Sequence, residues 1–188
     1  MTDDAQVTAW ALAAGRGDRT AAAAFVRATR QSVWRFLAGL ASPAEADDLT
    51  QETYLRAMRS LPSFAARSAA RTWVLGIARR VAVDHVRASA CRPHTVPMPA
   101  WTEITDRQHS GFDRRVALEQ LIAGLPAEQR TAFVATQVLG MPYAEAARVC
   151  GCPVGTIRSR VARARADLVA AITTQPGTRG RRNGTATG

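Results

Sequence analysis

The apolar residues of this chain recur three, four and seven positions apart over most of its length, which is the spacing of one helix face. In the stretch 142–171, Pro142 and a short run rich in Ala and Glu come first, and Gly151 followed by Pro153 then breaks the pattern. The second run has a clear apolar face, formed by Ile157, Val161, Ala164 and Leu168. Two short helices joined by a glycine-containing turn form a helix-turn-helix, which the pattern therefore predicts here.

The same spacing predicts two helices between about Val7 and Leu40. Gly15 and Gly17 separate them, and Thr20 is a candidate cap for the second helix. Trp34 and Phe36 are expected in the core of this segment, which shows no residues arranged for chemistry.

The next helix is predicted from its ends. Ser42-Pro43-Ala44-Glu45 forms a capping box with proline at the first helical position, and Leu61-Pro62 ends the helix. Its core face comprises Ala46, Leu49, Thr53, Ala57 and Leu61. The opposite face carries a ridge of acidic and amide side chains with one apolar residue, namely Asp48, Gln51, Glu52 and Leu55. This acidic ridge is suited to docking a basic protein surface, but an ordinary solvated face has the same spacing.

Residues 70–88 form a further predicted helix, with Trp73, Ile77 and Val81 on one side. Arginines lie mostly on the other side, and basic side chains mixed with an aromatic ring suit single-stranded nucleic acid. Trp73 is nevertheless expected in the core. Asp84 and His85 are no catalytic dyad, because adjacent helix positions do not face each other.

The sequence between residues 89 and 112 has three prolines within seven residues and no helical period, as expected of a linker. Two more helices follow, the second over Glu128 to Leu139, and would support the helix-turn-helix. The prediction is an all-α protein of two small helical domains joined by a Pro-rich linker. Its expected parts are domain 1–88, linker 89–112, domain 113–173 and a disordered basic tail 174–188.

The net charge of the chain indicates what kind of partner it binds. The 25 basic residues are all arginine, and the net charge is +10. This excess implies a polyanionic partner, for which nucleic acid is the best candidate. The second helix of the helix-turn-helix carries four arginines against one acid, Asp167, which suits the major groove better than a merely solvated surface helix.

Other classes of protein are disfavoured. The sequence has no apolar run of about 18 residues and no lipidation motif, and its acidic start lacks the basic residues of a signal peptide, so we expect a cytoplasmic protein without a membrane partner. Cys91, Cys150 and Cys152 are odd in number and are interpreted as packing residues. His94 and His109 are expected in solvent. We therefore expect no metal, no cofactor and no catalytic residues.

Three stretches, in this order, resemble the extracytoplasmic-function (ECF) sigma factors, the small promoter-recognition subunits of bacterial RNA polymerase. DDLTQETYLRA is similar to that family's polymerase-binding helix, ARTWVLGIARRVAVDHVR to its promoter-melting helix, and GCPVGTIRSRVARAR to its recognition helix. Within the family, the chain looks most like the actinobacterial sigma C type.

The resemblance implies a role for each matching residue. The acidic ridge would bind the clamp of the largest subunit of core RNA polymerase. The residues implied for the unpaired −10 strand are Ser63, Phe64, Ala65, Arg67, Arg79, Arg80, Asp84 and Arg87. Those implied for double-stranded −35 DNA, by base or backbone contact, are Tyr143, Glu145, Thr156, Arg158, Ser159, Arg160, Ala162 and Arg163. Arg80 departs from the family, which often has Asn there, and this leaves the −10 base preference open.

Two other functions share parts of this pattern. A stand-alone helix-turn-helix regulator would need a ligand pocket or a dimer interface in the N-terminal half, and an Arg-rich RNA-binding protein would bind without promoter sequence. The sequence leaves open whether an anti-sigma factor binds, and whether the two domains pack together.

Overall fold

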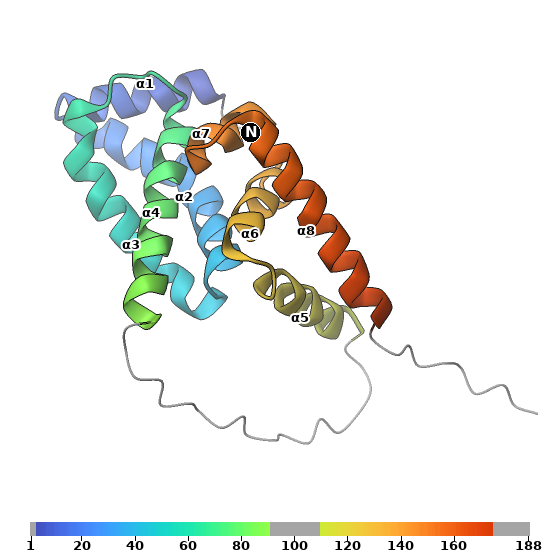
Figure 1. The fold of residues 1–188 in the computed structure, drawn as a ribbon. Coiled ribbons are helices and arrows are strands. Elements are labelled where there is room, and N and C mark those ends of the chain that lie inside the picture. Colours follow the sequence, from blue (N-terminus) through green and yellow to red (C-terminus); the bar gives the residue numbers. More distant parts are fainter. Residues whose placement is uncertain (1–2, 91–109, 175–188) are drawn as a thin grey trace, which may run out of the picture.

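A computed structural model describes residues 3–90 and 110–174, which contain helices and no strand (Figure 1). The N-terminal half comprises α1 (Asp4–Gly15), α2 (Arg19–Leu40), α3 (Pro43–Ser60), the 3₁₀ turn η1 (Leu61–Ser63) and α4 (Ala70–Ala90). The C-terminal half comprises α5 (Ser110–Ala123), α6 (Ala127–Phe133), the π-helical turn η2 (Val134–Val138), α7 (Tyr143–Cys150) and α8 (Val154–Thr174). The all-α prediction is confirmed.

The predicted linker and tail lie mainly outside the described residues. Helix α4 extends to Ala90 and α5 begins at Ser110, so the helices enter both ends of the range 89–112. Cys91, His94 and His109 also lie outside the described residues.

The predicted cap of α2 was wrong. Asp18, not Thr20, is the N-cap, and its carboxylate accepts the Ala21 N–H at 2.9 Å. Asp18 has the extended backbone that an N-cap needs, and its negative charge suits the positive end of the helix dipole. Thr20 is an exposed residue within the first turn.

The predicted N-cap of α3 is confirmed, but the Glu45 carboxylate binds the Ser42 hydroxyl where a full capping box would use the Ser42 backbone N–H. The Ser42 hydroxyl accepts the Glu45 N–H at 3.3 Å and donates to the Glu45 carboxylate at 2.7 Å. The other carboxylate oxygen of Glu45 lies 2.7 Å from Nε2 of His85 on α4, so the cap also joins two helices. The hydrogen bond from Ser42, followed by the contact with His85, lowers the pKa of Glu45.

The predicted apolar faces are buried, in one core cluster that extends through both halves of the chain and in a smaller one around Leu125, Ala164 and Leu168. All five residues predicted for the core face of α3 are buried, and so are the four predicted for α8. Phe36 is fully buried, whereas Trp34 is only half-buried at the edge of the core. Trp73 packs its ring against Phe64, with ring centroids 4.8 Å apart, as expected of a core residue.

The two halves pack against each other. In Figure 1, α7 lies against the N-terminal part of α4, while α6 lies beside α2, and the residue contacts agree. Gly39 of α2 permits this approach, because a Cβ atom there would lie 2.9 Å from two methyl carbons of Val134. Arg130 of α6 crosses the same boundary and donates to the Leu40 carbonyl at 3.0 Å. Burial lowers the pKa of the Arg130 guanidinium.

Candidate polymerase and promoter interface

The acidic ridge lies on the solvent side of α3. Asp48 and Gln51 are exposed, and Leu55 is 56% exposed, which adds one apolar residue to this polar surface. Glu52 is less free, because its carboxylate pairs with Arg56 at 2.7 Å one helical turn later. The ridge therefore presents one carboxylate, one amide and one apolar side chain to a partner, with a second carboxylate already in an ion pair.

A groove between α2 and α3 lies beside the ridge. Its lining is mixed: Val26, Tyr54 and Met58 lie next to Leu55, and Arg30, Asp47 and Thr50 add polar groups. A knob-like apolar side chain or a helix of a partner protein could occupy such a groove, so the surface offers both charge and apolar contact area.

The segment implied for a flipped −10 base connects η1 to α4. Ala65, Ala66 and Arg67 are exposed, and Ala66 has a φ of +50°, an unfavourable value for a residue other than glycine. Phe64 is buried beneath them, so its ring forms the floor of this loop instead of presenting a free face to a base. Ser63 is exposed, and its hydroxyl donates to the backbone carbonyl of Ser60, the last residue of α3, at 2.9 Å.

Helix α4 places the other residues implied for −10 DNA on two different sides. Arg80, Asp84 and Arg87 are exposed and spaced four and three residues apart, which puts them on one face. The Asp84 carboxylate accepts from Arg56 at 2.6 Å, and this bond, followed by the one to Glu52, raises the pKa of Arg56. Arg79 points elsewhere, toward the C-terminal half.

The helix-turn-helix is present over α7 and α8. Gly151 ends α7 with a φ of +64°, and the next N–H, that of Cys152, donates to the Ala147 carbonyl at 3.1 Å. This is the left-handed helix end that glycine favours, and it turns the chain toward α8. Ile157 and Val161 hold α8 in the core. The opposite face of α8 is left free for a ligand.

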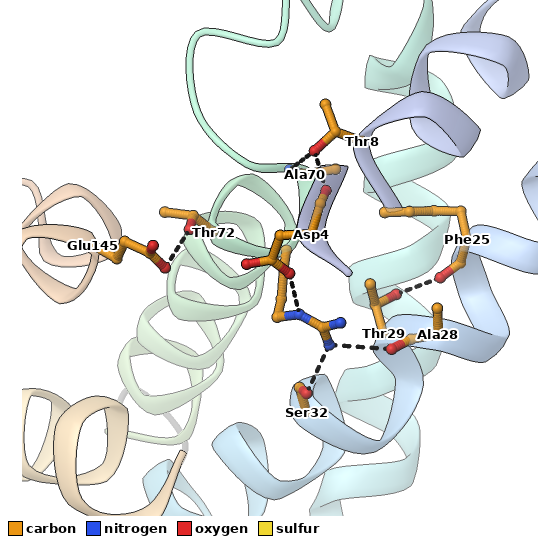
Figure 2. A network of polar contacts seen from close by, with 10 residues as sticks. Asp4, Thr8, Phe25, Ala28, Thr29, Ser32, Ala70, Thr72 and Glu145 are labelled. Atoms are coloured by element: carbon orange, nitrogen blue, oxygen red, sulfur yellow. Dashed lines mark hydrogen bonds and ion pairs between the residues drawn. The ribbon is translucent and has the colours of Figure 1, made fainter. Parts of the chain in front are cut away.

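The residues implied for −35 DNA divide into an exposed and a covered set. Arg158, Ser159, Ala162 and Arg163 are exposed and share one face of α8. Tyr143, Glu145, Thr156 and Arg160 are half-buried. Figure 2 shows that Glu145 reaches across to α4, where its carboxylate accepts from the Thr72 hydroxyl at 3.2 Å.

Glu128, at the start of α6, was not predicted from the sequence, yet it connects the two helices whose arginines are implied for DNA binding. Its carboxylate pairs with Arg160 of α8 and lies 3.6 Å from Arg79 of α4. One acid thus neutralises an arginine implied for −10 DNA and another implied for −35 DNA. Only the packing of the two halves brings these three residues together, so no local pattern could reveal them.

The cysteines that flank Gly151 pack as expected of small apolar residues. Cys150 is buried, and burial raises the pKa of its thiol to about 11. The Cys152 sulfur accepts from Arg160 at 3.4 Å. Within residues 3–90 and 110–174, no three His, Cys, Asp or Glu side chains gather as metal ligands would, and no helix is long and apolar enough to cross a membrane.

Comparisons with known proteins agree with this geometry. The family model for sigma-70 region 2 matches residues 25–91, and the model for sigma-70 region 4 matches residues 115–168. The first range covers most of α2 and all of α3 and α4, with the acidic ridge and the loop before α4. The second contains the helix-turn-helix.

Two relatives extend the match to nearly the whole chain. The ECF RNA polymerase sigma factor SigC of Mycobacterium tuberculosis and the probable RNA polymerase sigma-C factor of Mycobacterium bovis are each 53% identical over 171 residues, which cover 90% of this chain and 92% of the relative. This agrees with the resemblance to the sigma C type.

Solved structures show the same fold. CnrH, solved in complex with the cytosolic domain of CnrY, superposes with a TM-score of 0.72 at 22% identity, over 92% of this chain and 99% of that one. The sigma factor RpoE of Bartonella quintana, solved with the anti-sigma factor NepR, has a TM-score of 0.61 at 27% identity, over 80% and 95%. This chain belongs to the ECF sigma factors, transcription initiation factors that bind core RNA polymerase and recognise promoter DNA.

Proposed function

We propose that the chain docks on the polymerase clamp through the acidic ridge of α3, reads duplex −35 DNA with α8, and holds the unpaired −10 strand with the loop before α4 and the exposed face of α4. In this assignment, residues 1–88 form domain two, residues 89–112 the linker, and residues 113–173 domain four. The protein has no catalytic residue of its own and acts in the cytoplasm, where polymerase and chromosome are.

The observation that carries this proposal is the exposed acidic ridge on a chain of net charge +10. An acidic, partly apolar surface repels DNA but complements a basic protein surface. A stand-alone helix-turn-helix regulator has no use for such a ridge, whereas a factor that must carry DNA-binding helices to an enzyme requires one.

The proposed opening step uses binding energy and no covalent chemistry. Extruding a base from the duplex costs a few kcal/mol in lost stacking and pairing. The loop before α4 and the arginines of α4 would offer contacts that exist only once the −10 strand is unpaired. Trapping that strand shifts the equilibrium toward open DNA, while α8 anchors the complex upstream. An Arg side chain bidentate to guanine is the commonest specific base contact, so Arg158 and Arg163 favour a −35 element that contains guanine.

The packed arrangement of the two halves must open during this cycle. Arg79 and Arg160 share Glu128, and Glu145 is bonded to Thr72 at the start of α4. These residues cannot keep their mutual contacts and also bind two DNA segments. We therefore assign the packed arrangement to the free protein, and an open one to the complex with polymerase and promoter. Because the Bartonella quintana relative was solved with an anti-sigma factor, we also propose an anti-sigma factor as a partner of this chain.

Run-off transcription tests the proposal. Purified chain is added to core RNA polymerase with a library of upstream regions from the source genome. We expect transcripts that start at defined sites and depend on both proteins. The variant Arg158→Ala/Arg163→Ala should lose those starts while still co-purifying with core enzyme. If the chain gives no promoter-directed transcript, the proposal is wrong. If the chain also binds its DNA in the absence of core enzyme and represses transcription from it, the chain is a stand-alone regulator.

A further inference from the structure

The loop before α4 is strained and short, so its shape depends on what holds its two ends. It spans residues 64–69 between η1 and α4, and Ala66 within it has a φ of +50°. A residue with a side chain keeps such a backbone only where the surroundings impose it. The structure shows that helix α1, which neither the sequence motifs nor the family models include, touches both ends of this loop.

At the C-terminal end of the loop, the contact is a hydrogen bond. The Thr8 hydroxyl of α1 accepts the backbone N–H of Ala70, the first residue of α4, at 3.1 Å. The first N–H groups of a helix have no partner within the helix, and Thr8 supplies one from a different helix. The same hydroxyl donates to the Asp4 carbonyl at 2.8 Å, which fixes its hydrogen and directs its lone pair to Ala70 (Figure 2).

At the N-terminal end, the contact is a close backbone approach. A Cβ atom on Gly15 of α1 would lie 2.6 Å from the Leu61 carbonyl oxygen, so only glycine fits there without displacing η1. That same carbonyl accepts the Phe64 N–H at 3.0 Å and so closes the turn that leads into the loop. Gly15 thus sets the position of Leu61, before the loop, and Thr8 sets the position of Ala70, after it.

Helix α1 is itself fixed to the rest of the domain by one arginine. Arg71 of α4 donates to the Asp4 carboxylate at 2.9 Å, to the Ala28 carbonyl at 3.1 Å and to the Ser32 hydroxyl at 3.2 Å (Figure 2). Its side chain is 21% exposed, so this arginine belongs to the framework, unlike the exposed arginines further along α4. Any movement of α1 is therefore transmitted to α4 and α2 together.

We infer that α1 positions the −10 base-binding loop, with Thr8 and Gly15 as its positioning residues; this rests on the proposed function of that loop. Neither residue touches DNA. Thr8 holds the start of α4, Gly15 holds the end of η1, and the shape of the exposed turn at residues 65–67 follows from the distance between them. Base discrimination at the −10 element accordingly depends on a helix outside the recognition motifs.

The test measures base discrimination by the full chain bound to core RNA polymerase. The affinity of this holoenzyme is measured for a single-stranded oligonucleotide with the preferred −10 sequence and for one with the proposed flipped base replaced. The ratio of the two affinities is the readout. Thr8→Val keeps the shape of the side chain and removes its hydroxyl, while Thr8→Ser restores it. We expect Thr8→Val to lower the ratio about fivefold, the effect of losing one neutral hydrogen bond, and Thr8→Ser to return it to the wild-type value.

Two controls separate positioning from general destabilisation. Thr131→Val removes a hydroxyl that makes the same bond to the carbonyl four residues earlier, at 2.8 Å, but that bonds to no second helix in the described part of the chain. It should leave the ratio unchanged. Affinity for core polymerase should stay the same in all variants, and circular dichroism should show each to be folded at the assay temperature. Gly15→Ala, which acts at the other end of the loop, provides an independent second variant.

The outcomes distinguish this inference from the proposed function. If the wild-type holoenzyme discriminates but folded Thr8→Val or Gly15→Ala keeps the full ratio, α1 does not position the loop. If Thr131→Val lowers the ratio as much as Thr8→Val, the effect is general destabilisation and the inference is also wrong. If the wild-type holoenzyme shows no base discrimination on the unpaired strand, the assignment of the loop itself fails.

Discussion

Tyr54 is the residue whose chemistry the structure specifies most closely. Thr29 donates its hydroxyl hydrogen to the Phe25 carbonyl at 2.8 Å, so the contact of 2.7 Å between the Thr29 and Tyr54 oxygens must use the Tyr54 hydrogen. Burial then raises the pKa of Tyr54 to about 12, from a usual value of 10.0. The folded state therefore favours the protonated, neutral form of the Tyr54 side chain.

A pH dependence of stability follows from this pKa. The folded pKa lies above the unfolded one, so the contribution of Tyr54 is fully present below pH 10 and is lost as the pH rises toward 12. Wild-type protein should lose up to about 1.4 kcal/mol of unfolding free energy per pH unit in this window through Tyr54. Tyr54→Phe should lack that part of the slope and be about 1 kcal/mol less stable at neutral pH, because Thr29 loses a partner.

Urea unfolding followed by circular dichroism at a series of pH values measures this slope. Tyr143→Phe changes the only other tyrosine of the chain and serves as the control. The prediction is wrong if the slopes of wild-type protein and Tyr54→Phe coincide above pH 10.

Individual residues were predictable where a short pattern sets their environment. The N-cap at Ser42 and the glycine turn at Gly151 are such cases, because the required backbone and side-chain chemistry lie within four residues. Asp18 and Thr20 show the limit, since both are good caps and the choice depended on where the backbone leaves the helix. Phe64 was expected to face a base, and its burial against Trp73 depends on a contact nine residues away in the sequence.

At the scale of elements, the amphipathic pattern correctly predicted the helices and the faces that they bury, because packing follows the apolar stripe. Polar faces were less informative. The ridge of α3 and the far face of α8 both looked like partner surfaces, and the structure shows that some of their charges, such as Glu52, are paired within the molecule. A charged residue on a helix face is therefore a candidate for partner binding only where no neighbouring side chain of the same molecule already pairs with it.

Helix α3 carries a prediction about polymerase binding. Asp48→Lys should weaken the association with core RNA polymerase by about tenfold, because an exposed acid is replaced by a base at a surface that is complementary to a basic partner. Glu52→Lys should also lower the affinity for core enzyme, but it breaks the ion pair with Arg56 as well, so its effect has two causes. Fluorescence titration of labelled chain with core enzyme measures the affinity.

Asp167→Lys is the matched control for this prediction. It makes the same change in net charge on an exposed site of α8, far from the ridge in the sequence. If Asp48→Lys and Asp167→Lys bind core enzyme equally well, the ridge is an ordinary solvated face.

Helix α8 carries a prediction about the −35 element. Arg158→Ala and Arg163→Ala should each weaken binding to the preferred duplex by about 1–3 kcal/mol, with a smaller loss on unrelated DNA, because base contacts are lost. Arg59→Ala is the control, since Arg59 is also an exposed helical arginine but lies in the last turn of α3, outside the helix-turn-helix. Competition binding with matched and scrambled duplexes would show the difference. Equal losses on both duplexes would reduce the two arginines to phosphate contacts.

At the scale of the whole molecule, the sequence indicated two domains but left their relation open. The packing depends on contacts between residues far apart in the chain, such as Gly39 against Val134 and Thr72 with Glu145. These contacts leave no periodic pattern or motif in the sequence, because each residue looks like an ordinary helix residue when its own segment is considered alone. The shared acid Glu128 belongs to the same class and supplies the most direct test of the packed arrangement.

Glu128→Gln should loosen the contact between the two halves, because Arg79 and Arg160 lose the carboxylate that neutralises both. In the free chain, we expect the affinity for the −35 duplex to rise about fivefold and the distance between dyes on α2 and α8 to increase, an effect of ~1 kcal/mol that salt should diminish. Asp167→Asn is the control, since it removes one negative charge from α8 and leaves the bridge intact. Should both variants gain affinity equally with no change in dye distance, net charge alone explains the effect. A larger gain in affinity for Glu128→Gln at low salt, together with a longer distance between the dyes, would support the proposed role of Glu128. Its carboxylate would then hold Arg79 and Arg160 together in the free protein, until polymerase or promoter DNA separates the two halves.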